Sequence, residues 1–290
     1  MPEPLSDNAS AILDEATRVD GTPPISDQAL LAARQGTRTV IDFGEAVGIV
    51  GQGELDLVVR PSARGRGLGR RALRELLALE QATGDLRAWA HGENPAADVL
   101  LRGAGFSPVR TLLRMVLPPE RLSAAIAESR PLPDGFDIVP FTLGDERLAA
   151  AWVRVNAAAF ADHPEQGSVT REDFEAMTRE PWFIADDLRF AVDRADGRVA
   201  GFEWVKTTED GGETETELYV LGVDPAFAGR GLGAALLGET LRSMAAHQPT
   251  RITLYVDGDN ANAVSLYERA GFEVEQRSAQ WLRAAQDELC

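Results

Sequence analysis

Two short segments rich in glycine and arginine have the composition of an anion-binding loop. The first reads RGRGLG at residues 64–69, and the second reads AGRGLG at residues 228–233. Each follows an apolar stretch typical of a strand and precedes an amphipathic stretch typical of a helix. Because glycine tolerates positive φ, successive N–H groups can point at one anion, and the N-terminus of the next helix adds partial positive charge. The two segments therefore predict sites for a pyrophosphate group.

Other phosphate-binding loops have a different spacing of glycines. A dinucleotide-binding fingerprint needs G-x-G-x-x-G with an acidic residue about 20 residues later, and a P-loop ends in Gly-Lys-Ser/Thr. Neither pattern occurs at residues 64–69 or 228–233. One such segment alone fits a tight turn without a ligand almost as well, whereas two copies in the same context favour a binding function.

The loops belong to an internal repeat, which predicts the domain organisation. The segments ELDLVVRPSARGRGLGRRALRELL and LRAWAHGENPAADVLLRGAGF, at residues 54–77 and 86–106, return as ELYVLGVDPAFAGRGLGAALLGETL and ITLYVDGDNANAVSLYERAGF at residues 217–241 and 252–272. We expect two copies of one α/β domain. A proline-rich stretch at residues 130–141 separates them, so the domains are expected at 1–130 and 131–290.

In the second copy, the hydrophobic pattern predicts the elements that must position the loop. They are a helix over 146–160, a hairpin over 188–206, a strand over 216–223, a helix over 230–247, a strand over 251–257, a helix over 261–270 and a strand from 272. Within the strand over 216–223, the period of two predicts that Glu217, Tyr219, Leu221 and Val223 share one face.

With these motifs the sequence resembles the Gcn5-related N-acetyltransferases. The resemblance rests on R-x-x-G-x-G after an apolar strand, followed by Glu93-Asn94 or Asp259-Asn260 and then by a helix that ends in Gly-Phe. It implies two tandem domains of the α/β class, each a mixed, largely antiparallel sheet flanked by helices. It also implies acetyl-CoA as co-substrate, with the pyrophosphate of coenzyme A in the loop and pantetheine beside the preceding strand.

The resemblance narrows to the mycothiol synthases, an actinobacterial family of tandem acetyltransferases. The segments that carry it are Asp20-Gly21 with Asp27-Gln28, Asn156–Phe160, His163–Gly167, Phe202–Lys206 and Leu218–Asp224. It implies that a small-molecule amine, the cysteinyl amine of a cysteinyl-glucosaminyl-inositol, is acetylated to give mycothiol.

The resemblance carries site roles over to positions of this sequence. Those implied to bind acetyl-CoA are Leu221, Gly222, Val223, Ala228, Gly229, Arg230, Gly231, Leu232, Gly233, Ala234, Asn260, Asn262 and Ser265 in the second copy, and Leu57, Val58, Val59, Arg64, Gly65, Arg66, Gly67, Leu68 and Gly69 in the first. Those implied to bind the acceptor are Asp27, Glu165 and Lys206, and the strand positions of Glu217 and Tyr255 make them further candidates. The alternative is that these are solvated surface groups. Two positions depart from the family pattern, because Ala228 stands where Gln or Arg is usual and Asp27 stands where the family carries Glu.

Glu217 is the candidate general base. An α-amino group has a pKa of about 7.7–8.0, so a base that removes its proton helps transfer near neutral pH. Aligning the two copies on Pro61 and Pro225 places Glu217 opposite Gly53, so the first copy lacks this group. The alternative is that Glu217 is simply an exposed carboxylate in the acidic run 213–217.

Tyr267 is the candidate general acid, because the departing thiolate leaves more easily when a donor protonates it. Aligning the Gly-Phe pairs at 105–106 and 271–272 places Tyr267 opposite Leu101. The alternative is that Tyr267 is a core aromatic of its helix. Since the first copy lacks both the candidate base and the candidate acid, we expect catalysis in 131–290 and a non-catalytic role for 1–130.

Composition limits the partners. The formal net charge of −17 argues against nucleic acid, which needs a positive surface. No apolar run approaches the ~18 residues that span a membrane, and the acidic N-terminus lacks a signal core, so we expect a cytoplasmic protein, acting as a monomer. One cysteine, Cys290, and three dispersed histidines show no metal-ligand spacing, so no metal is expected.

Two other functions fit the same motifs. The first is a tandem acetyltransferase for another amine, such as an amino sugar or a protein N-terminus. The second is a sensor that binds acetyl-CoA without catalysis, which predicts loss of catalytic groups from both copies; Glu217 and Tyr267 argue against it.

Overall fold

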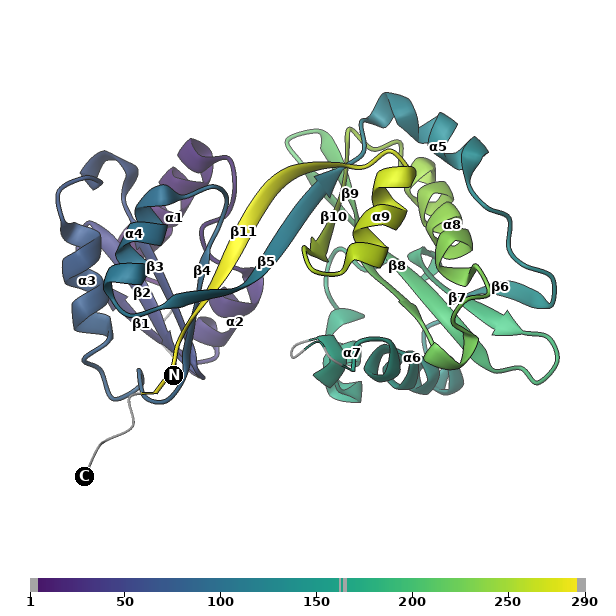
Figure 1. Cartoon of the computed structure of the whole chain (residues 1–290), viewed down its shortest axis with the longest axis horizontal. Helices are drawn as coiled ribbons and strands as arrows, with labels where there is room; N and C mark the ends of the chain where they lie inside the picture. Colours follow the sequence, from purple (N-terminus) through teal and green to yellow (C-terminus); the bar gives the residue numbers. More distant parts are fainter. Residues whose placement is uncertain (1–4, 162, 164–165, 286–290) are drawn as a thin grey trace. The chain divides into compact units, whose positions relative to one another are not determined.

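The computed structural model describes residues 5–161, 163 and 166–285, which pack into two compact units. The first unit contains the described residues up to Leu113, Asp257–Asp259 and those from Gln276 onward. The second contains Arg114–Val256 and Asn260–Glu275. Each unit is an α/β layer structure with a mixed sheet, as expected (Figure 1).

The elements of the first unit follow the order of the chain. They are α1 (Asp7–Asp20), α2 (Asp27–Arg34), β1 (Thr39–Asp42), β2 (Ala46–Gly51), β3 (Glu54–Val59), a short 3-10 helix (Pro61–Ala63), α3 (Leu68–Leu76), β4 (Leu86–Ala90), α4 (Pro95–Gly103) and most of β5 (Ser107–Val116). Strands run in the order β1-β2-β3-β4 with only β3 and β4 parallel. Apolar residues of α1 and α2 cover one face of this sheet, and those of α3 and α4 cover the other.

The elements of the second unit repeat this plan. They are a 3-10 helix (Pro119–Arg121), α5 (Leu122–Glu128), β6 (Phe136–Pro140), α6 (Glu146–Ala159), a 3-10 helix (Gln166–Ser168), α7 (Arg171–Met177), a 3-10 helix (Ala185–Asp187), β7 (Leu188–Asp193), β8 (Val199–Asp210), β9 (Glu213–Val223), a 3-10 helix (Pro225–Phe227), α8 (Leu232–Ala246), β10 (Arg251–Asp257), α9 (Ala261–Arg269) and the start of β11 (Glu273–Arg283). The strand order is β10-β9-β8-β7-β6, and only β10 and β9 are parallel to each other.

Two cores hold the second sheet between helices. Trp152 of α6, Phe174 of α7 and Trp204 of β8 are buried together on one face. Leu232 and Leu236 of α8 pack on the other face. Figure 1 shows α6 and α7 on one side of β6–β8 and α8 on the opposite side. The elements predicted for this copy are confirmed to within a few residues; the largest differences are that β8 continues to Asp210 and that β9 begins at Glu213.

The division by packing differs from the boundary expected between residues 130 and 131. The chain leaves the first unit within β5, at Leu113. The last part of β11 belongs to the first unit, because it pairs antiparallel with β4, with Ala279 opposite Ala90 and Arg283 opposite Leu86. A linear repeat cannot reveal this, since strand pairing is a non-local contact.

Candidate active site

The loop before α8 leaves its first helical N–H groups available to an anion. Gly229 and Gly231 have φ of 75° and 82°, a conformation that favours glycine. A Cβ at either position would meet nothing within 4 Å, so backbone geometry rather than crowding requires these glycines. Gly231 is the N-cap of α8, and no side chain caps it. Uncapped donors at a helix N-terminus can bind an anionic group, and the sequence predicts a pyrophosphate at this position.

Asp224 holds the start of this loop. Its Oδ1 accepts a hydrogen bond from the Ala226 N–H at 2.9 Å, and its Oδ2 lies 2.8 Å from Nη1 of Arg154 on α6. Nη2 of Arg198 lies 3.8 Å away from the same oxygen. Burial of Asp224 favours its protonated form, but the hydrogen bond from Ala226 and the charge of Arg154 outweigh this and lower its pKa below the ordinary value.

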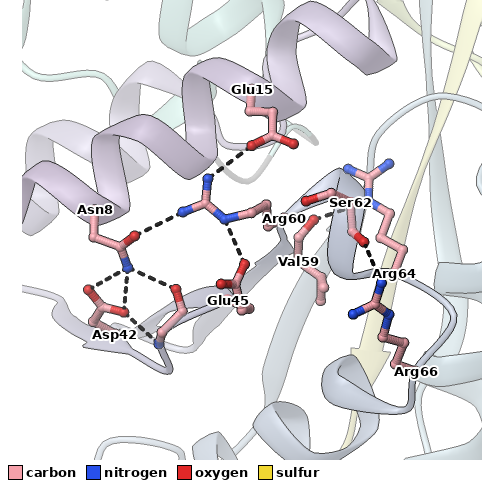
Figure 2. Close-up of polar contacts among 10 residues, drawn as sticks. Asn8, Glu15, Asp42, Glu45, Val59, Arg60, Ser62, Arg64 and Arg66 are labelled. Atoms are coloured by element: carbon pink, nitrogen blue, oxygen red, sulfur yellow. Dashed lines mark hydrogen bonds and ion pairs between the residues drawn. The ribbon is translucent and has the colours of Figure 1, made fainter.

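The loop of the first unit has the same backbone. Gly65 and Gly67 have φ of 76° and 80°, and Gly67 begins α3 without a side-chain cap. Its arginines, however, bind other parts of the protein. The Arg64 guanidinium pairs with both oxygens of Asp20 at 2.7 Å and donates from Nε to the Val59 carbonyl at 3.1 Å. Figure 2 shows Arg66 donating to the Ser62 carbonyl.

Arg60 anchors the start of the first loop in the same way that Asp224 anchors the second. Figure 2 shows its guanidinium between three partners: Glu15 of α1 at 2.9 Å, Glu45 at 2.7 Å and the Asn8 side-chain oxygen at 2.9 Å. Two arginines at this loop, Arg60 and Arg64, are therefore paired with carboxylates of their own unit.

A bulge in β9 brings Glu217 and Lys206 together. Trp204 is paired with Val220 and Val205 with Leu218, so Tyr219 is an extra residue in β9. Below this bulge Glu217 lies directly opposite Lys206. The two residues therefore lie on the same face of the sheet, that of Trp204.

The bulge also overturns one expectation. Leu221 lies opposite Glu203, on the face of the sheet away from Trp204, whereas Glu217 is on the Trp204 face. The prediction that Glu217 and Leu221 share a face was wrong, because one inserted residue reverses the alternation of side chains. As a result, Glu217 lies opposite Lys206, and both are candidates for binding the acceptor.

Aromatic side chains border Lys206. Its Nζ lies 5.5 Å from the ring centroid of Trp182, and that ring lies 5.0 Å from the ring of Tyr219. The Tyr219 hydroxyl is 3.4 Å from Sδ of Met177 on α7. Sequence reasoning missed Trp182 as a site residue, since nothing in the sequence separates it from a core tryptophan.

Tyr255 of β10 lies in the same electrostatic neighbourhood. Partial burial raises its pKa above the ordinary value; the nearby Arg114 guanidinium works against this, and the charge of Glu217 adds to it. The guanidinium carbon of Arg114 lies 5.9 Å from the Tyr255 ring centroid and pairs with Glu215 at 2.7 Å. The structure thus brings together three of the predicted acceptor residues, Lys206, Glu217 and Tyr255.

Tyr267 of α9 is buried, with 8 % of its surface exposed. Burial raises its pKa to about 12, so the hydroxyl keeps its proton at neutral pH. Its ring meets Phe272 edge to face at 6.1 Å, which is also what a core aromatic would do. A phenol that is protonated at neutral pH can donate a proton, but a pKa raised to about 12 makes it a weaker acid than an ordinary phenol.

The remaining predicted residues have varied surroundings. Leu57–Val59 end β3 as Leu221–Val223 end β9, and a Cβ on Gly222 would lie only 2.8 Å from the Phe202 ring. Gly69 lies in the first turn of α3, and Gly233 and Ala234 lie in the first turn of α8.

Asn260 caps α9 by accepting from the Ala263 N–H, and Ser265 accepts from Arg269. Asn262 lies in the first turn of α9. Asp27 begins α2, but its side chain lies outside the described part, as does all of Glu165.

On the other face of β8, Glu203 is a buried carboxyl. Its side chain is fully buried, and burial raises its pKa to about 8. Ser243 of α8 donates to its Oε1 at 3.3 Å, and Arg189 lies 4.0 Å away. Its Oε2 has no hydrogen-bond partner among the described residues. Nearby, His247 pairs with Asp187 at 2.8 Å.

Within the described ranges, no group of three or more His, Cys, Asp or Glu side chains is arranged to hold a metal ion. Of the helices in that part of the chain, none has both the length and the apolar character to cross a membrane.

Comparison with protein families gives two matches in this chain. The model of the acetyltransferase (GNAT) family matches residues 29–106 and 152–272. The chain belongs to this family. Each matched stretch contains one of the two loops, so this is a tandem GNAT protein and an N-acetyltransferase, and the GNAT fold implies that it binds acetyl-CoA.

Relatives of the GNAT chain point to one subgroup. It is 41% identical to a mycothiol acetyltransferase of Clavibacter michiganensis, covering 97% of this chain and 94% of the relative, and 43% identical to one of Streptomyces avermitilis, covering 90% and 86%. A tandem GNAT protein from the clavulanic acid biosynthesis pathway superposes with a TM-score of 0.73 at 18% identity, covering 99% of this chain and 98% of that one. The relatives confirm the resemblance predicted from the motifs.

Proposed function

We propose that this N-acetyltransferase transfers the acetyl group of acetyl-CoA to the cysteinyl amine of cysteinyl-glucosaminyl-inositol and so forms mycothiol. The similarity to mycothiol acetyltransferases over nearly the full length carries this proposal. We propose that it acts in the cytoplasm as a monomer, with a small-molecule acceptor and without a metal.

Catalysis is assigned to the second unit. There Glu217 stands opposite Lys206, whereas its counterpart in the first unit is Gly53. At the second loop, Arg154 and Arg198 both lie within 4 Å of Asp224, and the loop arginine Arg230 lies 5.1 Å from the ring of Phe227.

The first unit supports rather than catalyses. Arg60, just before the loop, pairs with Glu15 and Glu45, and Arg64 of the loop pairs with Asp20. A ligand anion at this loop would compete with those carboxylates for the same guanidinium groups. We therefore assign the weaker acetyl-CoA site, lined by residues 57–59 and 64–69, to this unit.

The reaction needs one base and one acid. Glu217 accepts a proton from the ammonium of the acceptor, and the freed nitrogen attacks the carbonyl carbon of the thioester. The new C–N bond forms as the C–S bond breaks, and the Tyr267 hydroxyl gives its proton to the departing sulfur. The nitrogen of the new amide then loses its second proton, which restores the Tyr267 hydroxyl. Asp27, Glu165, Lys206 and Tyr255 are assigned to the hydroxyl and ammonium groups of the acceptor.

Mass spectrometry tests the acceptor. The enzyme is incubated with acetyl-CoA and a panel of amines: the cysteinyl pseudodisaccharide, the same compound without cysteine, an amino sugar and a peptide with a free N-terminus. We expect one acetyl group to be added to the cysteinyl compound far faster than to any other. Preferential acetylation of another amine would overturn the proposed acceptor.

A further inference from the structure

In each unit an ion pair connects the first long helix, α1 or α6, to the start of the glycine-rich loop, and the charges of the two partners are reversed between the units. α1 and α6 each have 14 residues, and Glu15 and Arg154 are each the ninth. Arg60 and Asp224 each stand immediately before the proline that starts the 3-10 helix of the loop. The helix residue is acidic and the loop residue basic in the first unit, and the reverse holds in the second.

Both pairs have good geometry. Nη1 of Arg60 lies 2.9 Å from Oε2 of Glu15, and Nη1 of Arg154 lies 2.8 Å from Oδ2 of Asp224. Arg154 also donates to the Val199 carbonyl at 3.2 Å, so it joins α6, the start of β8 and the loop. The Asp224 side chain is only 9 % exposed, which limits screening of its charge by water.

A second tie exists in the first unit and is missing from the second. Asp20, the last residue of α1, pairs with Arg64 of the loop. The matching positions of the second unit are Ala159, the last residue of α6, and Ala228. Both partners are replaced by alanine, so this second ion pair has no counterpart in the second unit.

We propose that Arg154 and Asp224 are positioning residues for acetyl-CoA binding in the second unit. Their ion pair fixes the start of the loop 228–233, so its N–H groups are already directed when the pyrophosphate arrives. This inference rests on the proposed function of that loop as the donor site. It extends that function by explaining how the loop keeps its geometry with alanine at position 228.

The opposite polarity in the first unit supplies the design of the test. Because that unit holds the same two positions together with the charges reversed, an exchange of the charges is expected to preserve the tie in the second unit. Arg198 would repel a guanidinium at position 224, since its Nη2 lies 3.8 Å from Asp224. The exchange is therefore made with Arg198→Gln as its parent.

The experiment measures acetyl-CoA affinity by calorimetry and the KM of each substrate. Arg154→Gln and Asp224→Asn are expected to raise the acetyl-CoA Kd about three- to tenfold, with a parallel rise in its KM and little change in the acceptor KM. Asparagine still accepts from the Ala226 N–H, so Asp224→Asn isolates the ion pair. Arginine at position 224 cannot accept from the Ala226 N–H, so the exchange is judged against the single reversals: in the Arg198→Gln parent, Arg154→Glu combined with Asp224→Arg should bind acetyl-CoA more tightly than Arg154→Glu or Asp224→Arg alone.

Two further variants serve as controls: Glu15→Gln in the first unit and Gly231→Val in the loop of the second unit. Glu15→Gln breaks the equivalent pair of the first unit and should leave acetyl-CoA turnover unchanged. The inference would be overturned if Gly231→Val loses acetyl-CoA binding but Arg154→Gln keeps the wild-type affinity. It would also be overturned if the exchange variant binds acetyl-CoA no more tightly than Arg154→Glu or Asp224→Arg alone. If Gly231→Val keeps full affinity, the loop is not the donor site and the proposed function fails with it.

Discussion

Replacing Glu203 by Gln is expected to stabilise the second unit at neutral pH. Glu203 is fully buried on β8, and burial raises the pKa of its carboxyl from 4.5 to about 8. Glutamine keeps the shape of the side chain and an oxygen that accepts the hydrogen bond from Ser243. It removes the proton that the folded protein must hold.

The size of the effect follows from the two pKa values. A carboxyl with a raised pKa in the folded state keeps a proton that the unfolded chain releases. The contribution of Glu203 to the stability of the wild type is therefore fully present below pH 4.5, falls as pH rises from 4.5 towards 8, and is level above 8. Each pH unit in that window costs about 1.4 kcal/mol, so the expected loss at pH 7 is about 3 kcal/mol.

The assay is urea unfolding at a series of pH values from 4 to 9, followed by hydrogen exchange of peptides from β8. These peptides report the second unit alone, which matters because two units need not unfold together. The free energy of unfolding of Glu203→Gln should match the wild type near pH 4 and exceed it increasingly up to pH 8.

Glu209→Gln is the matched control, since it removes an exposed carboxylate from the same strand. It should change the stability by less than about 0.5 kcal/mol at every pH. A constant difference between wild type and Glu203→Gln across the series, or destabilisation by Glu203→Gln at pH 7, would refute the reasoning.

Three further outcomes are expected from kinetics. Gly231→Val should abolish acetyl-CoA-dependent turnover, because a side chain there blocks the pyrophosphate, whereas Gly67→Val should reduce it far less; equal losses in two folded variants would contradict the division between the units. Glu217→Gln should slow transfer roughly 10²–10⁴-fold at pH 7, and a pH–rate profile should show the loss shrinking above the pKa of the amine; a wild-type rate at pH 7 would place the base elsewhere. Tyr267→Phe should slow transfer by removing the proton donor, and the same profile should show no rescue at high pH.

The sequence predicted the local parts of this protein. The repeat, both loops and the helices α6, α8 and α9 were readable because hydrophobic periodicity and glycine spacing depend on neighbours along the chain. The need for positive φ at Gly229 and Gly231 belongs to the same class, since it follows from the local turn.

The tertiary structure decided what depends on contacts between distant residues. One extra residue at Tyr219 reversed the alternation in β9, so Glu217 faces Lys206 and not the side on which Leu221 lies. Neither strand sequence marks that bulge, because it is defined only by the register against β8.

The ends of the units show the same limit. The last part of β11 belongs to the first unit because it pairs with β4. The ion pair of Arg154 with Asp224 joins residues that are 70 positions apart in the sequence. Hydrophobic periodicity indicates whether a segment forms a helix or a strand. Which segments pack against each other is determined by the free energy of the whole fold. For that reason the sequence named the candidate residues, and only the structure showed which of them meet.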